Sequence, residues 1–117
     1  MKKIFILCCA AALGGCSVFK DRNVYEKEKM VASWYMHGTR TANGERFNPD
    51  GLTAAHKTLP FGTKLRLTYR DKTIIVRIND RGPFLKGRHL DLSRGAAKAI
   101  GCFERGVCVL EVERLTQ

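Results

Sequence analysis

At 117 residues the chain is long enough for one domain and too short for two of ordinary size. It holds 21 lysines and arginines against 11 acidic residues, a formal net charge of +10. The positive charges are spread along the chain, with no continuous basic run and no interleaved aromatic residues. This pattern disfavours nucleic-acid binding, and we expect no nucleic acid among the partners.

The amino end has the parts of a bacterial lipoprotein signal. Two lysines precede an apolar run that is shorter than the ~20 residues a membrane-spanning helix needs. Small residues then lead to Cys16, and the sequence Leu-Gly-Gly-Cys resembles a lipobox. We therefore predict a signal peptide over residues 1–15 and lipid attachment at Cys16. Ser17 after it favours anchoring to the periplasmic face of the outer membrane of a Gram-negative bacterium.

Removal of this signal would change both the charge and the cysteines. The net charge would fall to +8, with 19 basic residues against 11 acidic ones. Apart from the lipidated cysteine, only Cys102 and Cys108 would remain, in an oxidising compartment. They either form a disulfide or are two small core residues. Their spacing is not that of a zinc site, and no histidine pair lies near them. We expect no metal and no cofactor.

Residues 16–30 are mostly polar and charged, and we predict a lipidated tether there, followed by one domain over residues 31–115. The domain opens with a strand at residues 30–36, which ends in aromatic residues. A glycine-rich loop that carries Glu45 follows. A short strand is then expected to deliver His56.

The next two strands form the clearest local pattern. Leucines alternate with polar residues from Lys64 to Tyr69, and residues 70–72 form a polar link. A second alternating run begins at Ile74 and ends at Asp80. Two alternating runs around a short polar link predict a β-hairpin.

A turn with Gly82 and Pro83 follows, and then a short helix and a last strand. Ser93 is a suitable N-cap for the helix and Gly101 a suitable end. The last strand is expected at residues 107–112. Several short strands with one small helix and no βαβ rhythm predict a compact barrel or sandwich.

Four ionisable residues stand at turns or strand ends and are candidates for chemistry: Glu45, His56, Asp80 and Asp91. No Ser-His-Asp set, phosphate loop or dinucleotide fingerprint accompanies them. Carboxylates are the acids and bases of glycan cleavage, which is the chemistry this set favours in a cell-envelope protein. Each residue also has a structural alternative: a turn bond for Asp80, a supporting hydrogen bond for His56, loop surface for Glu45, and support of the helix entry beside Arg88 for Asp91.

Five motifs in one order carry a family resemblance: ASWY, TANGE, AAHKTLPFGT, INDRGPF and R-x-x-DLS-x-x-AAK. From about residue 32 to residue 112 the chain resembles the rare lipoprotein A family of septal-ring lytic transglycosylases. The resemblance implies a mainly β fold, a six-stranded double-psi β-barrel with one or two short helices. It implies an endolytic enzyme that cleaves peptidoglycan glycan strands between N-acetylmuramic acid and N-acetylglucosamine and leaves 1,6-anhydro ends, in cell-wall remodelling or daughter-cell separation.

The resemblance also implies roles for individual residues. The residues regarded as essential in that family correspond to Asp80, Glu45 and His56. Other glycan-cleaving double-psi barrels have an acid in a motif that the HLDLS sequence of this chain, residues 89–93, resembles. Asp91 therefore competes with Asp80 as general acid. We favour Asp80, because it lies in the family's own motif. The candidates for substrate binding are Trp34, Tyr35, Thr41, Asn43, Arg81, Pro83 and Arg88, of which the first two could equally be core and the next two could shape their loop.

The sequence departs from the family pattern in two places. Met36 stands where relatives have a glycine after the tyrosine, and no sporulation-related repeat follows the barrel. A non-catalytic, expansin-like glycan-binding or wall-loosening lipoprotein therefore remains the alternative. We expect a monomer, and no particular division or envelope protein is indicated as a partner.

Overall fold

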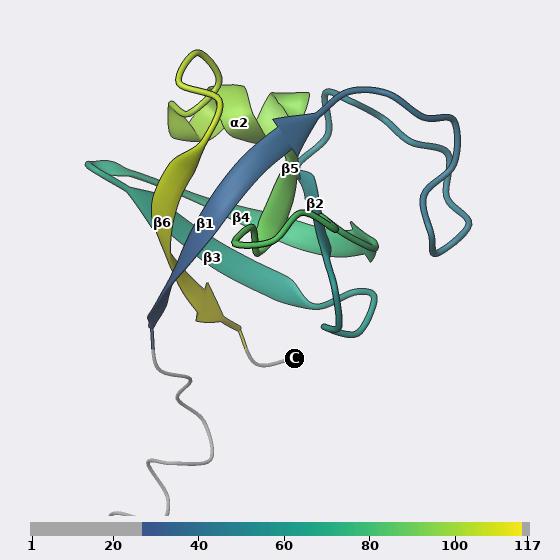
Figure 1. The fold of residues 1–117 in the computed structure, drawn as a ribbon, viewed down its shortest axis with the longest axis horizontal. Coiled ribbons are helices and arrows are strands. Elements are labelled where there is room, and N and C mark those ends of the chain that lie inside the picture. Colours follow the sequence, from purple (N-terminus) through teal and green to yellow (C-terminus); the bar gives the residue numbers. More distant parts are fainter. Residues whose placement is uncertain (1–26, 116–117) are drawn as a thin grey trace, which may run out of the picture.

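The computed structural model describes residues 27–115, in which the amphipathic runs form six strands that close into a barrel with one helix (Figure 1). The predicted signal and Cys16 lie outside the described residues. The elements are β1 (Glu28–Tyr35), β2 (Thr53–His56), β3 (Lys64–Tyr69), β4 (Lys72–Asp80), β5 (Leu90–Ser93), α2 (Arg94–Ile100) and β6 (Cys108–Arg114).

Around the barrel the strands follow the order β1, β5, β2, β4, β3, β6. The β1–β5 and β2–β4 pairs are parallel, and the other four pairs are antiparallel. Because every strand is paired on both sides, the barrel has no free edge. The predicted mainly β, six-stranded barrel with a short helix is confirmed.

Three predicted boundaries are wrong by a few residues. β1 begins at Glu28, so the last three residues of the predicted tether belong to the barrel, where they pair with β6. The hairpin link contains only Arg70 and Asp71, because Lys72 already pairs with Tyr69. The last strand runs to Arg114 rather than to residue 112, because β6 continues to pair with β3.

Alternate residues of each strand fill the barrel. Each large aliphatic side chain buried there contributes roughly 1.5–3 kcal/mol relative to exposure. The large side chains that are buried almost completely include Leu65, Leu67, Val76, Ile78, Leu90, Leu92, Ile100 and Leu110.

Helix α2 covers one end of the barrel, and its ends are capped as predicted (Figure 1). The Ser93 hydroxyl accepts a hydrogen bond from the Ala96 amide at 3.1 Å, and Gly101 ends the helix with a φ of 89°. Cys102 and Cys108 form a disulfide between the helix end and the start of β6. The two cysteines therefore do not lie on one strand. No helix within residues 27–115 is long and apolar enough to cross a membrane.

Gly95 in α2 provides a test of how the β1–β2 loop is fixed to the barrel. Its amide donates to the Pro49 carbonyl oxygen at 2.7 Å, and a Cβ atom built on it would lie 2.4 Å from the Asp50 carbonyl oxygen. We expect Gly95→Ala to lower the free energy of unfolding by about 2 kcal/mol in urea titrations, although alanine favours a helix by ~1 kcal/mol.

Ala99→Gly, at an exposed position of the same helix, is the matched control for helix propensity. We expect it to cost about 1 kcal/mol. A Gly95→Ala protein as stable as the wild type would show that the loop is not held against the helix.

Candidate active site

A β-bulge between β2 and β4 sets the direction of Asp80. Ala54 pairs with Ile78, but the next residue of β2, Ala55, pairs with Asp80, so Asn79 is an extra residue in β4. Strict alternation from Ile78 would turn Asp80 into the barrel. The extra residue reverses the alternation, and Asp80 lies on the outer face.

A row of four residues crosses four neighbouring strands on this outer face. Ser33 of β1 pairs with Asp91 of β5, Asp91 pairs with Ala55 of β2, and Ala55 pairs with Asp80 of β4. With strands ~4.8 Å apart, the Cα atoms of the two aspartates are separated by roughly 10 Å. Ala55 between them is small and buried, so no large side chain in this row separates the two carboxyl groups.

Three hydrogen bonds fix the Asp80 carboxylate. Its Oδ1 accepts from the amides of Ala42 at 2.8 Å and Arg81 at 2.9 Å, and its Oδ2 accepts from the Tyr35 hydroxyl at 2.8 Å. A carboxylate has about four lone-pair positions. Within residues 27–115, one such position, on Oδ2, accepts no hydrogen bond.

The two neighbouring aromatic residues of β1 have different surroundings. The Tyr35 ring stacks on Phe47 with centroids 4.8 Å apart, and burial, then the hydrogen bond and charge of Asp80, raise the pKa of its hydroxyl. Tyr35 thus remains a donor to Asp80. Trp34 packs against the core, stacks on Phe103 and donates to the Phe103 carbonyl oxygen at 3.1 Å. Of the two alternatives for Trp34, the structure supports the core residue.

Asp91 has different surroundings from Asp80. Its Oδ1 accepts one hydrogen bond, from the Ser33 hydroxyl at 3.0 Å. Burial raises the pKa of its carboxyl group, the charge of Asp80 adds to this, and Ser33 and Arg88 oppose it. Asp91 therefore keeps its proton to a higher pH than an ordinary aspartate. Arg88, a predicted substrate-binding residue, is half-buried and acts on this carboxyl group.

Glu45 is bound within the protein rather than free for proton transfer. Its carboxylate accepts two hydrogen bonds from Arg77, one from the Asn79 side chain at 3.1 Å and one from the Asn43 side chain at 3.0 Å. These bonds, that from Arg77 first, lower the pKa of Glu45 to about 2. Glu45 is thus a charged anchor between its loop and β4.

The rest of the TANGE loop is folded on itself and placed against the end of β4. Thr41 is buried and its hydroxyl donates to the Asn43 side chain, while the Asn43 amide donates to the Asn79 carbonyl oxygen at 3.2 Å. Thr41 and Asn43 were predicted either to bind substrate or to shape their loop, and these contacts shape the loop. The anchored loop then presents the Ala42 amide to Asp80.

His56 supports the loop on the other side of Asp80. Its Nδ1 accepts from the amides of Thr58 and Leu59, each at 3.1 Å, and burial, then the charge of Arg81, lower the pKa of the imidazole. Arg81 Nη1 donates to the Leu59 carbonyl oxygen at 2.8 Å. Within residues 27–115, no hydrogen bond joins the His56 ring to Asp80 or Asp91. Pro83, predicted to bind substrate, is buried.

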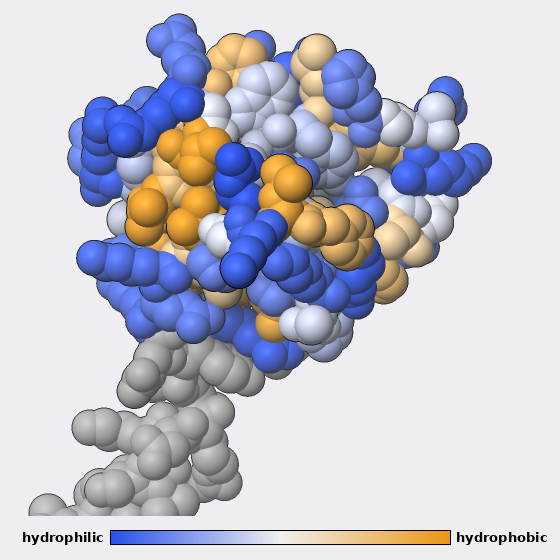
Figure 2. Space-filling model, viewed as in Figure 1, coloured by the Kyte–Doolittle hydropathy of each residue, from blue (hydrophilic) through white to orange (hydrophobic). Residues whose placement is uncertain are grey.

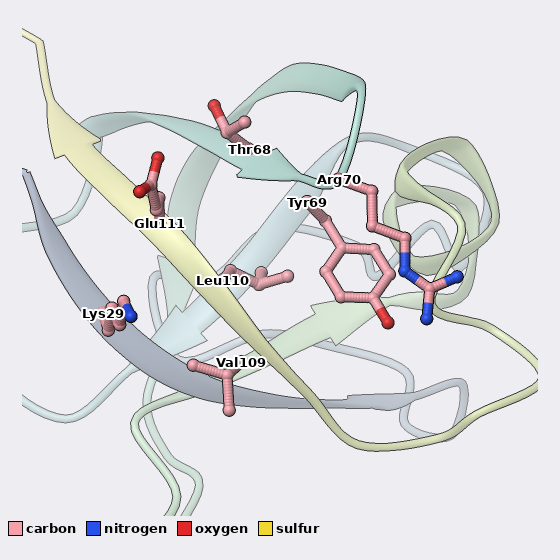
Figure 3. A pocket seen from close by; sticks show the side chains of 7 residues that line it. All are labelled: Lys29, Thr68, Tyr69, Arg70, Val109, Leu110 and Glu111. Atoms are coloured by element: carbon pink, nitrogen blue, oxygen red, sulfur yellow. The ribbon is translucent and has the colours of Figure 1, made fainter.

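A surface hollow of about 370 Å³ lies between β1, β3 and β6 (Figure 3). It is lined by other residues than those of the outward row and its two supporting loops. In that hollow the Arg70 guanidinium lies 5.0 Å from the centre of the Tyr69 ring, and none of the predicted site residues is present. Residues 27–115 contain no group of three histidine, cysteine or acidic side chains placed to hold a metal ion.

Three polar side chains that contact the site were absent from the sequence-based set: Ser33, Arg77 and Asn79. Alternation in β4 does place Arg77 and Asn79 on one polar face, which was a usable signal. Their common partner, Glu45, lies in a different loop and could not be found from the strand alone.

The Glu45–Arg77 ion pair predicts that the difference in stability between the wild type and Glu45→Gln depends on pH. The folded-state pKa of about 2 lies below the ordinary value of 4.5, so the pair's contribution is complete above about pH 4.5 and is lost as the pH falls toward 2. We expect Glu45→Gln to be less stable than wild type in urea at about pH 6, and the difference to shrink by about pH 3. Glu113→Gln, which removes the single-bond surface pair with Arg66, should show a smaller difference at both pH values. A Glu45→Gln difference that does not change with pH would contradict the ion pair.

Known sequences match the part of the chain that forms this barrel. The family described as "Lytic transglycolase" matches residues 27–112. "Probable endolytic peptidoglycan transglycosylase RlpA" of Synechocystis sp. is 60% identical over 82 residues, covering 66% of this chain and 26% of that protein. "Endolytic peptidoglycan transglycosylase RlpA" of Pseudomonas aeruginosa is 52% identical over 88 residues, covering 71% and 26%. The Campylobacter jejuni protein of that name is 47% identical over 88 residues, covering 71% and 32%. The chain thus spans between about a quarter and a third of the length of these relatives.

Solved structures with lower identity show the same fold. The Streptomyces papain inhibitor superimposes with a TM-score of 0.68 at 20% identity, covering 80% of this chain and 97% of the inhibitor. The apo expansin of Clavibacter michiganensis gives a TM-score of 0.66 at 21% identity, covering 79% and 52%. The predicted double-psi β-barrel is confirmed, and the chain belongs to the lytic transglycolase family.

Proposed function

We propose that this protein is an endolytic lytic transglycosylase that cleaves peptidoglycan glycan strands between N-acetylmuramic acid and N-acetylglucosamine and leaves 1,6-anhydro ends. The single observation that carries the proposal is the pair of outward aspartates, Asp80 of β4 and Asp91 of β5, on the two strands that flank β2 in the barrel. The names of the related RlpA proteins support the same activity.

The reaction needs a proton donor for the glycosidic oxygen and an acceptor for the proton of the sugar's own 6-hydroxyl, which is the internal nucleophile. Two carboxyl groups with different surroundings can divide these roles. Asp91, whose pKa is raised by burial, is suited to donate. Asp80, with one free position on Oδ2 beside the Tyr35 hydroxyl, is suited to accept and to face the positive charge that develops on the sugar. This division reverses the preference drawn from the motif alone.

Glu45 and His56 act in this proposal as positioning residues. Glu45 holds the loop whose Ala42 amide binds Asp80. His56 organises the loop whose Leu59 carbonyl oxygen binds Arg81, the residue after Asp80. Loss of either would move Asp80 without removing a reacting group.

We further propose that the mature protein is a monomer held by a lipid on Cys16 at the periplasmic face of the outer membrane, where it acts in wall remodelling or daughter-cell separation. The basic composition fits such a surface, since wall carboxylates and lipid head groups are anionic.

The proposal is tested with purified protein on intact sacculi and on sacculi freed of peptides by an amidase, with anhydro-muropeptides or anhydro-glycans detected by mass. We expect Asp80→Asn and Asp91→Asn each to lower product formation by at least about a hundredfold while remaining folded. Asp71→Asn, the same change at an exposed hairpin turn, is the control and should retain full activity.

Wild-type protein that binds sacculi without releasing anhydro products would favour the expansin-like, non-catalytic alternative. Product formation that persists in both aspartate variants would show that the chemistry lies elsewhere.

The division of roles has its own test in the pH profile. Because the donor must carry its proton, kcat/KM should fall as the pH rises above the ordinary aspartate range and through the raised pKa of Asp91. A kcat/KM that increases steadily with this rise in pH would contradict Asp91 as the donor.

A further inference from the structure

Three exposed apolar side chains stand on the β2–β3 loop and on the β4–β5 loop, which begins directly after Asp80. Phe61 is 41% exposed, Phe84 is 81% exposed and Leu85 is 61% exposed. Figure 2 shows apolar surface over the loop that joins β4 to β5, where Phe84 and Leu85 stand. Trp34 and Tyr35, for which sugar contact and a place in the core were equal alternatives, stack on Phe103 and Phe47.

Arg81 joins the two loops into one surface. Its guanidinium donates to the His56 and Leu59 carbonyl oxygens and lies 4.0 Å from the centre of the Phe61 ring. Its backbone amide binds the Asp80 carboxylate. Phe61 is therefore held at a fixed place relative to Asp80 through a single residue.

The Phe84 ring is also supported from below. Gly82 and Pro83 are buried, and a Cβ atom built on Gly82 would lie 3.5 Å from Cε2 of the Phe84 ring. The ring thus rests over Gly82 with most of its surface in solvent. Four residues of chain span at most roughly 14 Å, so Phe84 stays within a few sugar rings of Asp80.

We propose that Phe84, with Phe61 beside Arg81, forms an aromatic platform that stacks against the apolar face of a sugar ring of the glycan strand next to the bond that is cleaved. An exposed aromatic ring presents an apolar face on which the apolar face of a sugar ring can stack. The platform rests on the proposed glycan-cleaving function, and it sets where along the strand the two aspartates act.

The platform is tested by binding, separately from catalysis. In the inactive Asp80→Asn background, Phe84→Ala should weaken binding to amidase-treated sacculi roughly five- to tenfold in a sedimentation assay, because the ring contact is lost. Phe84→Trp should keep the affinity. Leu85→Ala is the matched control, since it removes an exposed apolar side chain without a ring, and it should leave binding unchanged. The Asp80→Asn protein and each double variant should have the same thermal midpoint.

Binding that is unchanged by Phe84→Ala would overturn the platform, while anhydro-product formation by the wild type would still stand as the separate test of the enzyme. Equal losses in Phe84→Ala and Leu85→Ala would overturn it as well, because they would indicate general apolar contact. Binding of the protein to vesicles of phosphatidylethanolamine and phosphatidylglycerol that both variants abolish, with glycan binding intact, would assign the loop to a membrane surface instead.

Discussion

The extra residue of β4 is the feature on which the site depends. If β4 paired with β2 without the bulge at Asn79, Asp80 would continue the inward alternation of Val76 and Ile78 and enter an apolar core, where a carboxylate is costly. With the bulge, Asp80 stands outside, in the same row as Asp91. Asn79 itself is buried, and its side-chain amide donates to Glu45, so the residue that makes the bulge also binds the loop whose Ala42 amide contacts Asp80.

Two loops then fix Asp80 from opposite sides. The loop held by Glu45 supplies the Ala42 amide, and the loop organised by His56 holds the Arg81 side chain. The two residues that a motif comparison would place among the catalytic groups are in this structure the anchors of those loops. Such anchors explain how a residue can be necessary for activity without touching substrate, because small displacements of a reacting group reduce rate strongly.

Much of this fold could be predicted from the sequence. The alternation of Leu65 and Leu67 gave the hairpin, and Ser93 and Gly101 marked the helix ends. The motifs gave the barrel and the acids. The direction of Asp80 could not be predicted, because apolar alternation runs unbroken to Ile78 and the bulge exists only relative to β2. Nor could the Glu45–Arg77 pair, which joins residues 32 positions apart.

The claim that Asp80 and Asp91 share one outer surface is tested most directly by NMR titration of the Asp91 carboxyl carbon. In the wild type its pKa should lie above the ordinary aspartate range, because of burial and the neighbouring charge. In Asp80→Asn, which removes that charge, the pKa of Asp91 should fall while its hydrogen bond to Ser33 remains. An Asp91 pKa that is ordinary in the wild type and unchanged in Asp80→Asn would contradict the shared surface and the division of acid and base built on it.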